Sequence, residues 1–307
     1  EGEDKNMLKA AIEFGKNKLG IPILIGAEKR IKEQLKKIGL DENYKIEIIN
    51  STFKEKREKY VEYLYKKLQR DGQLKRDVDR LVRNDRIAWG SAMIACKDAD
   101  AMVTGNIRHY AASIEKLKKV VDPRPGEEIF GMTMLVSKGK TILVADTNVQ
   151  DFPSSERLVN VSISCVRVAR LFGFDPKVAF LSHSTFGKPI SKNTKHVRDA
   201  IELLKNKNVD FDFDGEMQPD VALNPIYQEI YPFSKIVGKA NILMMPALHS
   251  AAISTKLMKS FGGAKLIGPL LIGLGLPIEV APLRSSTSEI LNLASIAAYS
   301  SDIIDYS

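Results

Sequence analysis

Residues 21–50 read IPILIGAEKRIKEQLKKIGLDENYKIEIIN and decide the fold. An apolar run over 21–27 precedes a charged amphipathic segment over 28–38, and a second apolar run covers 44–50. This order predicts a strand, a helix and a strand. The same alternation continues with apolar runs at 99–105, 177–183 and 240–246. Strands that alternate with helices are typical of a parallel sheet with helices on both faces. The sequence therefore predicts a doubly wound α/β fold.

The expected helices lie between these runs. They cover residues near 5–18, 28–38, 54–97 with a break at Asp71–Gly72, 108–119, 154–172, 191–206 and 249–261. The last helix lies within TSEILNLASIAAYSS, where Ser286 or Thr287 is suited to cap the start and Glu289 falls in the first turn.

A second unit is indicated by the Pro/Gly-rich segment VDPRPGEE at 121–128, which interrupts the alternation. The two apolar runs that follow in GMTMLVSKGKTILVADT meet at Ser137–Lys140 and predict an antiparallel hairpin. The longest apolar tract, LIGPLLIGLGLPIEVAPL at 266–283, is broken by glycines and prolines. We expect a buried strand and loops there.

The stretch DFDFDGEM at 210–217 matches the start of a calcium-binding EF-hand loop. The twelfth position of such a loop must be a bidentate Glu, and here it is Val221. The alternation of Phe211 and Phe213 with acids has the two-residue period of a half-buried strand. We therefore expect a strand that Gly215 ends with a turn, and no metal site.

The composition is that of a soluble globular protein, with 44% apolar and 27% charged residues over 307 positions. The net charge of +8 (46 basic minus 38 acidic residues) is spread over segments in which acids and bases alternate, so we expect no nucleic-acid partner. No apolar run is long enough for a membrane span. Cys96 and Cys165 lack metal-binding or disulfide spacing. These features predict a cytoplasmic protein.

The most chemically suggestive segment is LSHSTFGKPISKN at 181–193. There an expected strand ends in Ser182, Ser184 and Thr185, with Lys188 close behind. Hydroxyls and free N–H groups at the carboxyl edge of a parallel sheet commonly bind phosphorylated ligands. An ordinary Ser/Thr-rich connection explains the segment equally well. The scattered histidines and the lack of P-loop, GxGxxG, HExxH and GxSxG patterns add no other site.

Several segments together resemble the phosphate acetyltransferase (phosphotransacetylase) family across nearly the whole chain. They are ADAMVTGNIRHY, VDPRPGEEIFGMTML, VADTNVQDFPSSERL, LSHSTFG, DFDGEMQPDVALN, GKANILMMPALHSAAISTKL and GGAKLIGPLLIGL. MVTGNIRHY, DPRPG and MPALHSAAISTKL are most similar to the phosphotransacetylase-like C-terminal half of large bacterial NADP-dependent malic enzymes.

The resemblance implies two α/β units with a cleft between them, as in phosphotransacetylase and isocitrate dehydrogenase-like folds. One unit would be discontinuous, with residues 1–123 and 275–307, and the other, 124–274, would mediate dimerisation. It also implies that Asp214, Glu216, Gln218 and Asp220 orient loops beside the cleft through hydrogen bonds instead of binding calcium.

Active members of the family resemble one another at a Ser-Arg-Gly-x-x-x-x-Asp stretch before the last helix. Similarity in that helix places Pro282 and Leu283 at the Ser-Arg pair and Glu289 at the Asp. Arg284 comes one residue late, a displacement of about 3.3 Å in an extended chain. Loss of one positioned donor commonly costs roughly 10²- to 10³-fold in rate, so we expect little acetyl transfer.

The resemblance thus implies an acetyl-CoA-binding, oligomerising regulatory domain of a malic enzyme. Oxidative decarboxylation of malate to pyruvate, with NADP and a divalent metal, would belong to an N-terminal half that these residues do not include. The expected partners are acetyl-CoA or another CoA ester, further copies of the chain, and that N-terminal domain. Two alternatives stay open, namely an active phosphate acetyltransferase that uses Arg284 with Ser285 or Ser286, and a purely structural dimerisation module.

The candidate residues for CoA contact follow from motif position and chemical suitability. They are Arg108, Asn148, Ser182, Ser184 and Thr185. Glu289 is the acidic residue at the position of the family Asp, and no residue is predicted to bind a metal.

Overall fold

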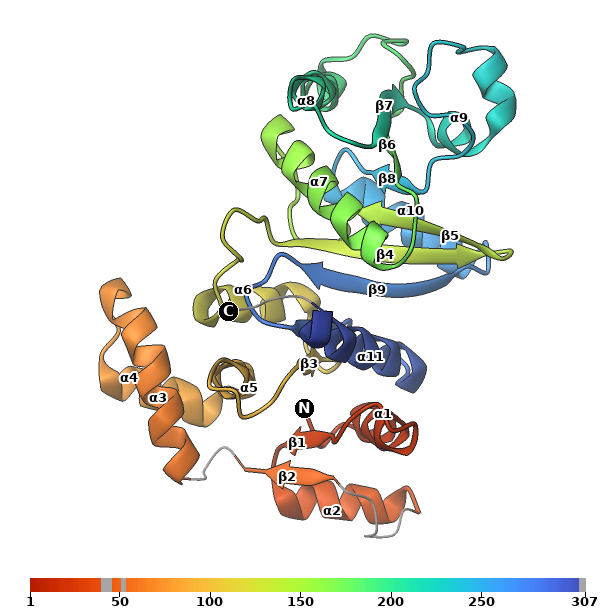
Figure 1. Ribbon diagram of the computed structural model, residues 1–307. Coiled ribbons are helices and arrows are strands. Elements are labelled where there is room, and N and C mark those ends of the chain that lie inside the picture. The colour runs from red at the N-terminus through yellow and green to blue at the C-terminus, as the bar shows by residue number, and fades with distance from the viewer. Residues whose placement is uncertain (40–45, 51–53, 304–307) are drawn as a thin grey trace. The chain divides into compact units, whose positions relative to one another are not determined.

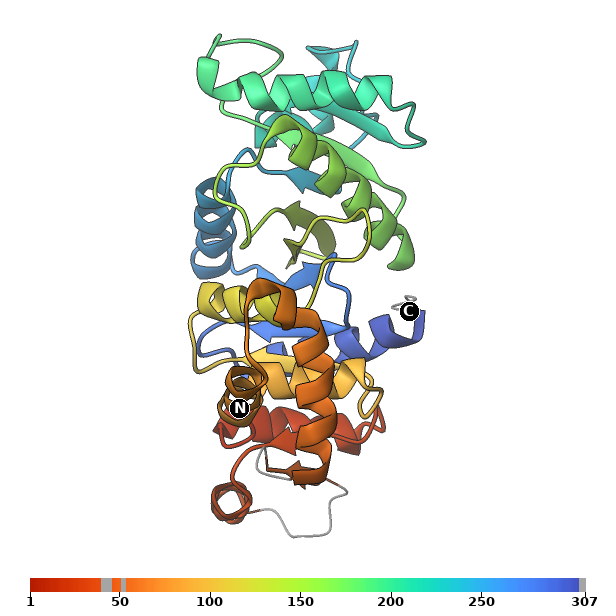
Figure 2. The same cartoon turned by 90° about the vertical axis from the view of Figure 1, so that its left-hand side faces the viewer.

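The computed structural model describes residues 1–39, 46–50 and 54–303. The described part divides into two compact units, Glu1–Pro125 with Leu274–Ser307, and Gly126–Gly273. The boundaries expected from the sequence lay at 123/124 and 274/275. Each unit combines strands with helices, as predicted for an α/β fold (Figures 1 and 2).

The first unit contains two short parallel sheets. One pairs β1 (Ile23–Ile25) with β2 (Glu47–Ile49), and the other pairs β3 (Met102–Gly105) with β10 (Ile278–Ala281). The strand predicted at 44–50 is longer than β2, because residues 46 and 50 are not part of the strand. Positions 44–45 lie outside the described residues. At Gly105 a Cβ would lie 2.3 Å from the Ala281 carbonyl oxygen, so only glycine allows β3 to approach β10 this closely.

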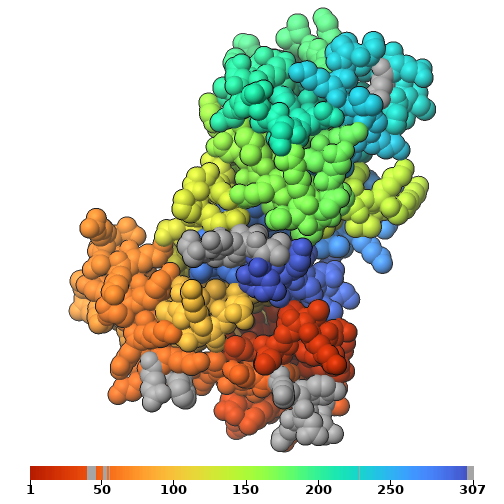
Figure 3. Space-filling view, viewed as in Figure 1, coloured from red at the N-terminus to blue at the C-terminus, as the bar shows by residue number. Residues whose placement is uncertain are grey.

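The helices of the first unit pack on these strands or on one another, and α3 and α4 contact other helices. They are α1 (Lys5–Lys16), α2 (Glu28–Lys37), α3 (Lys54–Leu68), α4 (Lys75–Asn84), α5 (Arg86–Ala95), α6 (Tyr110–Val120) and α11 (Thr287–Ile303), with the 3-10 turn η1 (Gln69–Asp71) after α3. The space-filling view shows α1 in red directly against α11 in dark blue (Figure 3).

The segment 54–97 was predicted as helix with one break near Gly72, and this break is present. A second break at Asp85 was missed. Its carboxylate accepts from the amides of Ile87 and Ala88, at 2.9 and 3.4 Å. This contact caps α5 and separates it from α4.

The second unit is built on one six-stranded sheet with the order β7-β6-β8-β5-β4-β9. The strands are β4 (Phe130–Ser137), β5 (Lys140–Ala145), β6 (Lys177–Leu181), β7 (Asp212–Met217), β8 (Ile242–Met244) and β9 (Lys265–Ile272). β5, β8, β6 and β7 are parallel, whereas β4 is antiparallel to both β5 and β9. The pairing of Ser137 with Lys140 confirms the predicted hairpin.

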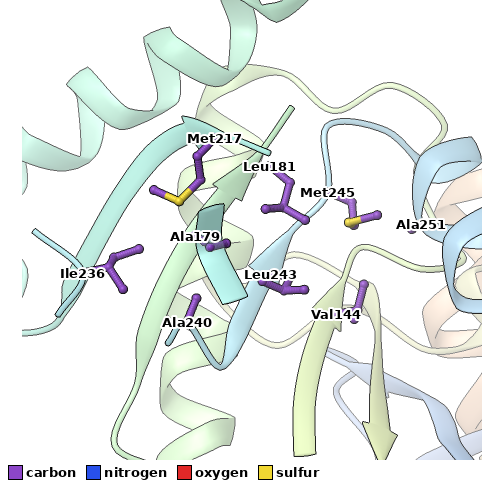
Figure 4. Packing of buried hydrophobic residues seen from close by; sticks show 10 residues of the cluster. Val144, Ala179, Leu181, Met217, Ile236, Ala240, Leu243, Met245 and Ala251 are labelled. Atoms are coloured by element: carbon purple, nitrogen blue, oxygen red, sulfur yellow. The ribbon is translucent and has the colours of Figure 1, made fainter. Parts of the chain in front are cut away.

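Helices cover both faces of this sheet. α7 (Ser155–Leu171) and α8 (Lys195–Asn206) contact each other on one face, whereas α10 (Leu248–Ser260) lies on the other (Figures 1 and 2). Shorter segments complete the unit, namely η2 (Lys192–Thr194), α9 (Pro219–Leu223) and η3 (Pro225–Glu229). Val144, Leu181, Met217 and Leu243 from four neighbouring strands form a buried cluster with Ala222 of α9 and Ala251 of α10 (Figure 4).

Two predictions about strands were wrong. Gly215 does not end its strand, because β7 continues to Met217. Gly215 has a φ of 144° and remains paired with β6. A Cβ at this position would lie 2.5 Å from the Phe180 carbonyl oxygen, so a side chain would not fit. The tract 266–283 contains two strands instead of one, since β9 belongs to the second unit and β10 to the first.

Candidate functional site

The predicted hydroxyls of the second unit meet at the carboxyl ends of β6 and β7. Ser182, Ser184 and Thr185 follow β6, and all three are buried. The Ser184 hydroxyl donates to the Glu216 carboxylate at 2.9 Å, and the Ser182 and Ser184 oxygens are 3.2 Å apart. Thr185 Oγ1 accepts from the amide of Gln218 at 3.2 Å. Their side chains thus face one another and β7.

Glu216 is the centre of this network, and it is 1% exposed. Besides Ser184, its carboxylate accepts from the Gly187 amide at 3.0 Å and from the Arg198 guanidinium at 3.4 Å. Arg198 also donates to Thr194 Oγ1 on η2. A buried carboxylate is stable only when several donors compensate for lost hydration. Glu216 therefore fixes the loop that follows β6.

Three of the four acidic and amide positions expected to orient loops do so in the structure. Asp214 accepts from the Lys235 amide at 2.8 Å, Glu216 binds as described, and the Gln218 side chain donates to the His183 carbonyl at 2.8 Å. Asp220 accepts from the neighbouring Val221 amide. Among the described residues no group of three or more His, Cys, Asp or Glu could hold a metal ion.

Asn148 lies at the same edge of the sheet, after β5. Its amide donates to the Asp146 carboxylate at 3.0 Å, and so do the amides of Gly131 and Val149, at 3.0 and 3.1 Å. Asp146 also pairs with Arg157 at 3.7 Å. Burial raises the pKa of Asp146, while these amide donors and Arg157 oppose the rise. Asp146 is not among the residues predicted from the sequence, although an Asp directly after a strand often accepts hydrogen bonds from the following amides.

The first unit holds a separate polar cluster at the carboxyl ends of β3 and β10. Arg108 follows β3 and is half-buried, with Glu1 and Asp85 carboxylate oxygens at 3.6 and 3.9 Å. Its Nη1 and the side-chain oxygen of Asn106 are buried and have no hydrogen-bond partner. The guanidinium is thus paired with two carboxylates, while its Nη1 remains a hydrogen-bond donor without an acceptor.

The loop after β10 is fixed by backbone bonds to the loop after β3. The Asn106 amide donates to the Ala281 carbonyl at 3.0 Å, and the Arg284 amide donates to the Asn106 carbonyl at 2.9 Å. Arg284 has a φ of 61° and an exposed side chain, and Leu283 is also exposed. Pro282 and Leu283 thus occupy the turn, where neither side chain can donate a hydrogen bond.

The hydroxyls beside this turn are bound locally. Ser285 is buried, and its hydroxyl donates to the Pro282 carbonyl at 2.8 Å. Ser286 and Glu289 form a capping box at the start of α11. The Glu289 carboxylate accepts from the Ser286 amide at 2.8 Å and from its hydroxyl at 2.9 Å, while the Glu289 amide donates to Ser286 Oγ at 3.3 Å. This confirms the predicted N-terminal cap.

A cavity of about 340 Å³ also lies in the first unit. Its wall includes Met93, Met102 and Ala294, from α5, β3 and α11. This wall is mostly apolar, and none of the predicted site residues lines it.

The comparisons with known proteins agree with this geometry. The model of the family described as phosphate acetyl/butaryl transferase matches residues 1–298. The chain belongs to the phosphate acetyl/butaryl transferase family. Among solved members, a phosphotransacetylase from Streptococcus pyogenes is 27% identical with a TM-score of 0.88, and the match covers 98% of this chain and 92% of the other. The fold class predicted from the sequence is confirmed.

The curated relatives in this family fall into two groups. An NADP-dependent malic enzyme of Rhizobium meliloti is 42% identical over 97% of this chain but only 39% of its own length. The phosphate acetyltransferase of Bacillus subtilis is 28% identical over 97% of this chain and 92% of its own length. The chain therefore spans about two fifths of the length of the malic enzymes it matches and resembles their phosphotransacetylase-like region.

No helix among the described residues is long and apolar enough to cross a membrane. Both cysteines are free.

Proposed function

We propose that these residues form the acyl-CoA-sensing, oligomerising domain of an NADP-dependent malic enzyme and that they do not transfer acetyl groups. The observation that carries this proposal is the turn before α11. Pro282 and Leu283 stand where active family members resemble one another in a Ser-Arg pair. The nearest hydroxyls and the acidic residue are occupied, since Ser285 binds Pro282 and Ser286 binds Glu289.

The higher identity to malic enzymes supports the same assignment, at 42% and 37% for the Rhizobium meliloti and Rickettsia prowazekii proteins. In such a protein the oxidative decarboxylation of malate would occur in a separate domain, with its NADP and divalent metal. Here acetyl-CoA acts as an effector that shifts a conformational equilibrium. By linkage, malate or NADP binding would change acetyl-CoA affinity by the same factor.

Arg108 and Asn148 are the proposed polar contacts for the CoA ester. Arg108 is proposed from its position in the motif and because its Nη1, although 3.9 Å from the Asp85 carboxylate, makes no hydrogen bond. For Ser182, Ser184 and Thr185 we propose a role at the loop after β6, with ligand contact through the backbone of that loop, because their hydroxyls are buried and engaged.

An active phosphate acetyltransferase is the second candidate, favoured by the near-complete coverage of the Bacillus subtilis enzyme. In that case Arg284, which is exposed beside the turn, would replace the missing arginine. The two candidates are separated by assaying phosphate-dependent consumption of acetyl-CoA with the wild-type chain and with Arg284→Ala. Turnover well above background that Arg284→Ala abolishes would establish the transferase, and its absence in a chain that binds acetyl-CoA supports the sensor.

A purely structural module would bind no CoA ester. Titration with acetyl-CoA up to millimolar concentration separates this possibility from the sensor, because stable oligomers without any binding would exclude sensing.

A further inference from the structure

Phe152 is a large apolar side chain that lies outside the core. It belongs to the loop after β5 and is 66% exposed. The backbone on both sides of the ring is anchored. The Gln150 amide donates to the Asp146 carboxylate at 3.1 Å, and the Leu248 amide of α10 donates to the Asp151 carbonyl at 3.0 Å. The exposed ring is therefore presented by a fixed segment of backbone.

Two imidazole rings flank Phe152. The ring centroid of His196 lies 6.2 Å from that of Phe152, and the ring centroid of His249 lies 5.8 Å from it. His196 is in the first turn of α8 and His249 is in the first turn of α10, two helices on opposite faces of the sheet (Figures 1 and 2). The strands that lead to these three segments, β6, β8 and β5, are neighbours in the sheet. The three rings thus meet at the carboxyl edge of parallel strands, where open α/β sheets bind their ligands.

The hydrogen bonding of His196 favours a planar ligand with an amino group. Its Nε2 donates to the Pro246 carbonyl at 2.9 Å, because a carbonyl oxygen can only accept. In the neutral ring, Nδ1 is then an acceptor. Nucleic-acid bases stack on the rings of Phe and His, and adenine also carries an exocyclic amino group that donates hydrogen bonds. Adenine therefore suits both the rings and the acceptor.

The segment that leads to His196 is basic. Residues 183–198 include Lys188, Lys192, Lys195 and Arg198 and no acidic residue. Lys195 and Arg198 form ion pairs, while Lys188 and Lys192 are exposed. Lysine side chains commonly bind phosphate groups. Positive charge beside a set of aromatic rings is what a nucleotide with several phosphates requires.

We propose that Phe152, together with His196 and His249, is the platform on which the adenine ring of the CoA ester stacks. This inference rests on the proposed function and names the contact for the nucleotide part of its ligand. Asn148, the proposed polar contact, lies in the same loop, four residues before Phe152. One loop would therefore contact two parts of the ligand, with the exposed lysines beside its phosphates.

The first test measures acetyl-CoA affinity by isothermal titration for the wild type, Phe152→Ala, Phe152→Trp and Phe233→Ala. Phe233 is the matched control, since it is 65% exposed in the same unit. Phe152→Ala should weaken binding about 10-fold or more, because a stacking surface is lost. Phe152→Trp and Phe233→Ala should bind at least as tightly as the wild type. Equal affinity of Phe152→Ala and the wild type would overturn the proposal.

The second test places a fluorescent reporter on the platform with Phe152→Trp. The native Trp89 is fully buried in the first unit, so its emission should not respond to a ligand at this loop. Acetyl-CoA should quench the introduced indole in a saturable way, because adenine would stack on it, and it should leave Phe233→Trp unchanged. Equal quenching of both variants would contradict the platform, and so would calorimetric binding to Phe152→Trp without quenching.

The nucleotide part of CoA separates this inference from the sensor. The probe is 3′-phosphoadenosine 5′-diphosphate, which carries the adenine and phosphates of CoA without pantetheine. If the wild type and Phe152→Ala bind acetyl-CoA equally, the platform alone fails. If acetyl-CoA does not bind the wild type but the nucleotide quenches Phe152→Trp, the platform stands and sensing fails. If neither ligand binds at millimolar concentration, both fail.

Discussion

The Glu289 carboxylate binds both the amide and the hydroxyl of Ser286, at 2.8 and 2.9 Å. Glu289, which we propose to stand at the position of the base of active family members, therefore caps α11. A carboxylate in the first turn of a helix is also favoured by the helix dipole. Under the proposed function, Pro282, Leu283 and this capping contact take the place of the residues that transfer acetyl groups in active members.

Replacing Glu289 tests its structural role. Glu289→Ala removes the carboxylate from the capping box and should lower the free energy of unfolding by about 1 kcal/mol. Glu289→Gln keeps an acceptor and should lose less than half of that. Urea unfolding of the three chains measures the difference, and acetyl-CoA affinity should stay the same in all of them. A large loss of binding in Glu289→Gln would instead show that the carboxylate contacts the ligand.

Glu216 should be the most sensitive residue of the loop after β6. Glu216→Ala leaves Ser184 and the Gly187 amide without their acceptor and Arg198 without one of its partners, so we expect a loss of about 3 kcal/mol in the free energy of unfolding. Ser184→Ala removes one neutral donor and should cost about 1 kcal/mol. Denaturant titrations compare the two variants. Equal effects would mean that Glu216 does not organise the loop.

The buried Asp146 predicts a specific pH dependence. Its pKa is raised in the folded protein, so the folded state binds the additional proton. The contribution of Asp146 to the free energy of unfolding therefore falls as pH rises from the unfolded value of about 3.9 through the folded pKa, and it is constant above that.

Urea unfolding of the wild type and Asp146→Asn between roughly pH 4 and 7 measures this contribution by difference. The wild type should lose stability relative to Asp146→Asn as pH rises. The opposite slope would mean that Arg157 and the amide donors outweigh burial and hold the pKa of Asp146 below its usual range.

Arg108 should contribute to effector binding. Arg108→Gln removes the charge while keeping a polar side chain, and we expect acetyl-CoA affinity to fall about 10-fold or more. Arg80→Gln, on the exposed part of α4, is the matched control and should bind like the wild type. Equal affinity of all three chains in isothermal titration would remove Arg108 from the site.

Local sequence signals predicted the cap of the last helix and the hairpin well. Ser286 and Glu289 have capping-box spacing, and Lys138–Gly139 marks a tight turn between two apolar runs. The strand–helix alternation gave the fold class. These features depend on contacts between residues close in the chain, so their patterns are visible without a structure.

Long-range contacts explain what could not be predicted. Ser184 and Glu216 are 32 residues apart, so nothing in LSHSTFG shows that its hydroxyls turn toward β7. Gly215 was taken as the end of a strand, yet it stays in β7 because the neighbouring strand leaves no room for a side chain.

The most direct test of the central claim is a calorimetric titration of acetyl-CoA into this chain in phosphate buffer. We predict saturable binding, with the thermal power returning to its original baseline after each injection. A sustained shift of the baseline would reveal turnover of acetyl-CoA with phosphate and contradict the assignment as a sensor. An absence of any binding at millimolar acetyl-CoA would contradict it as well.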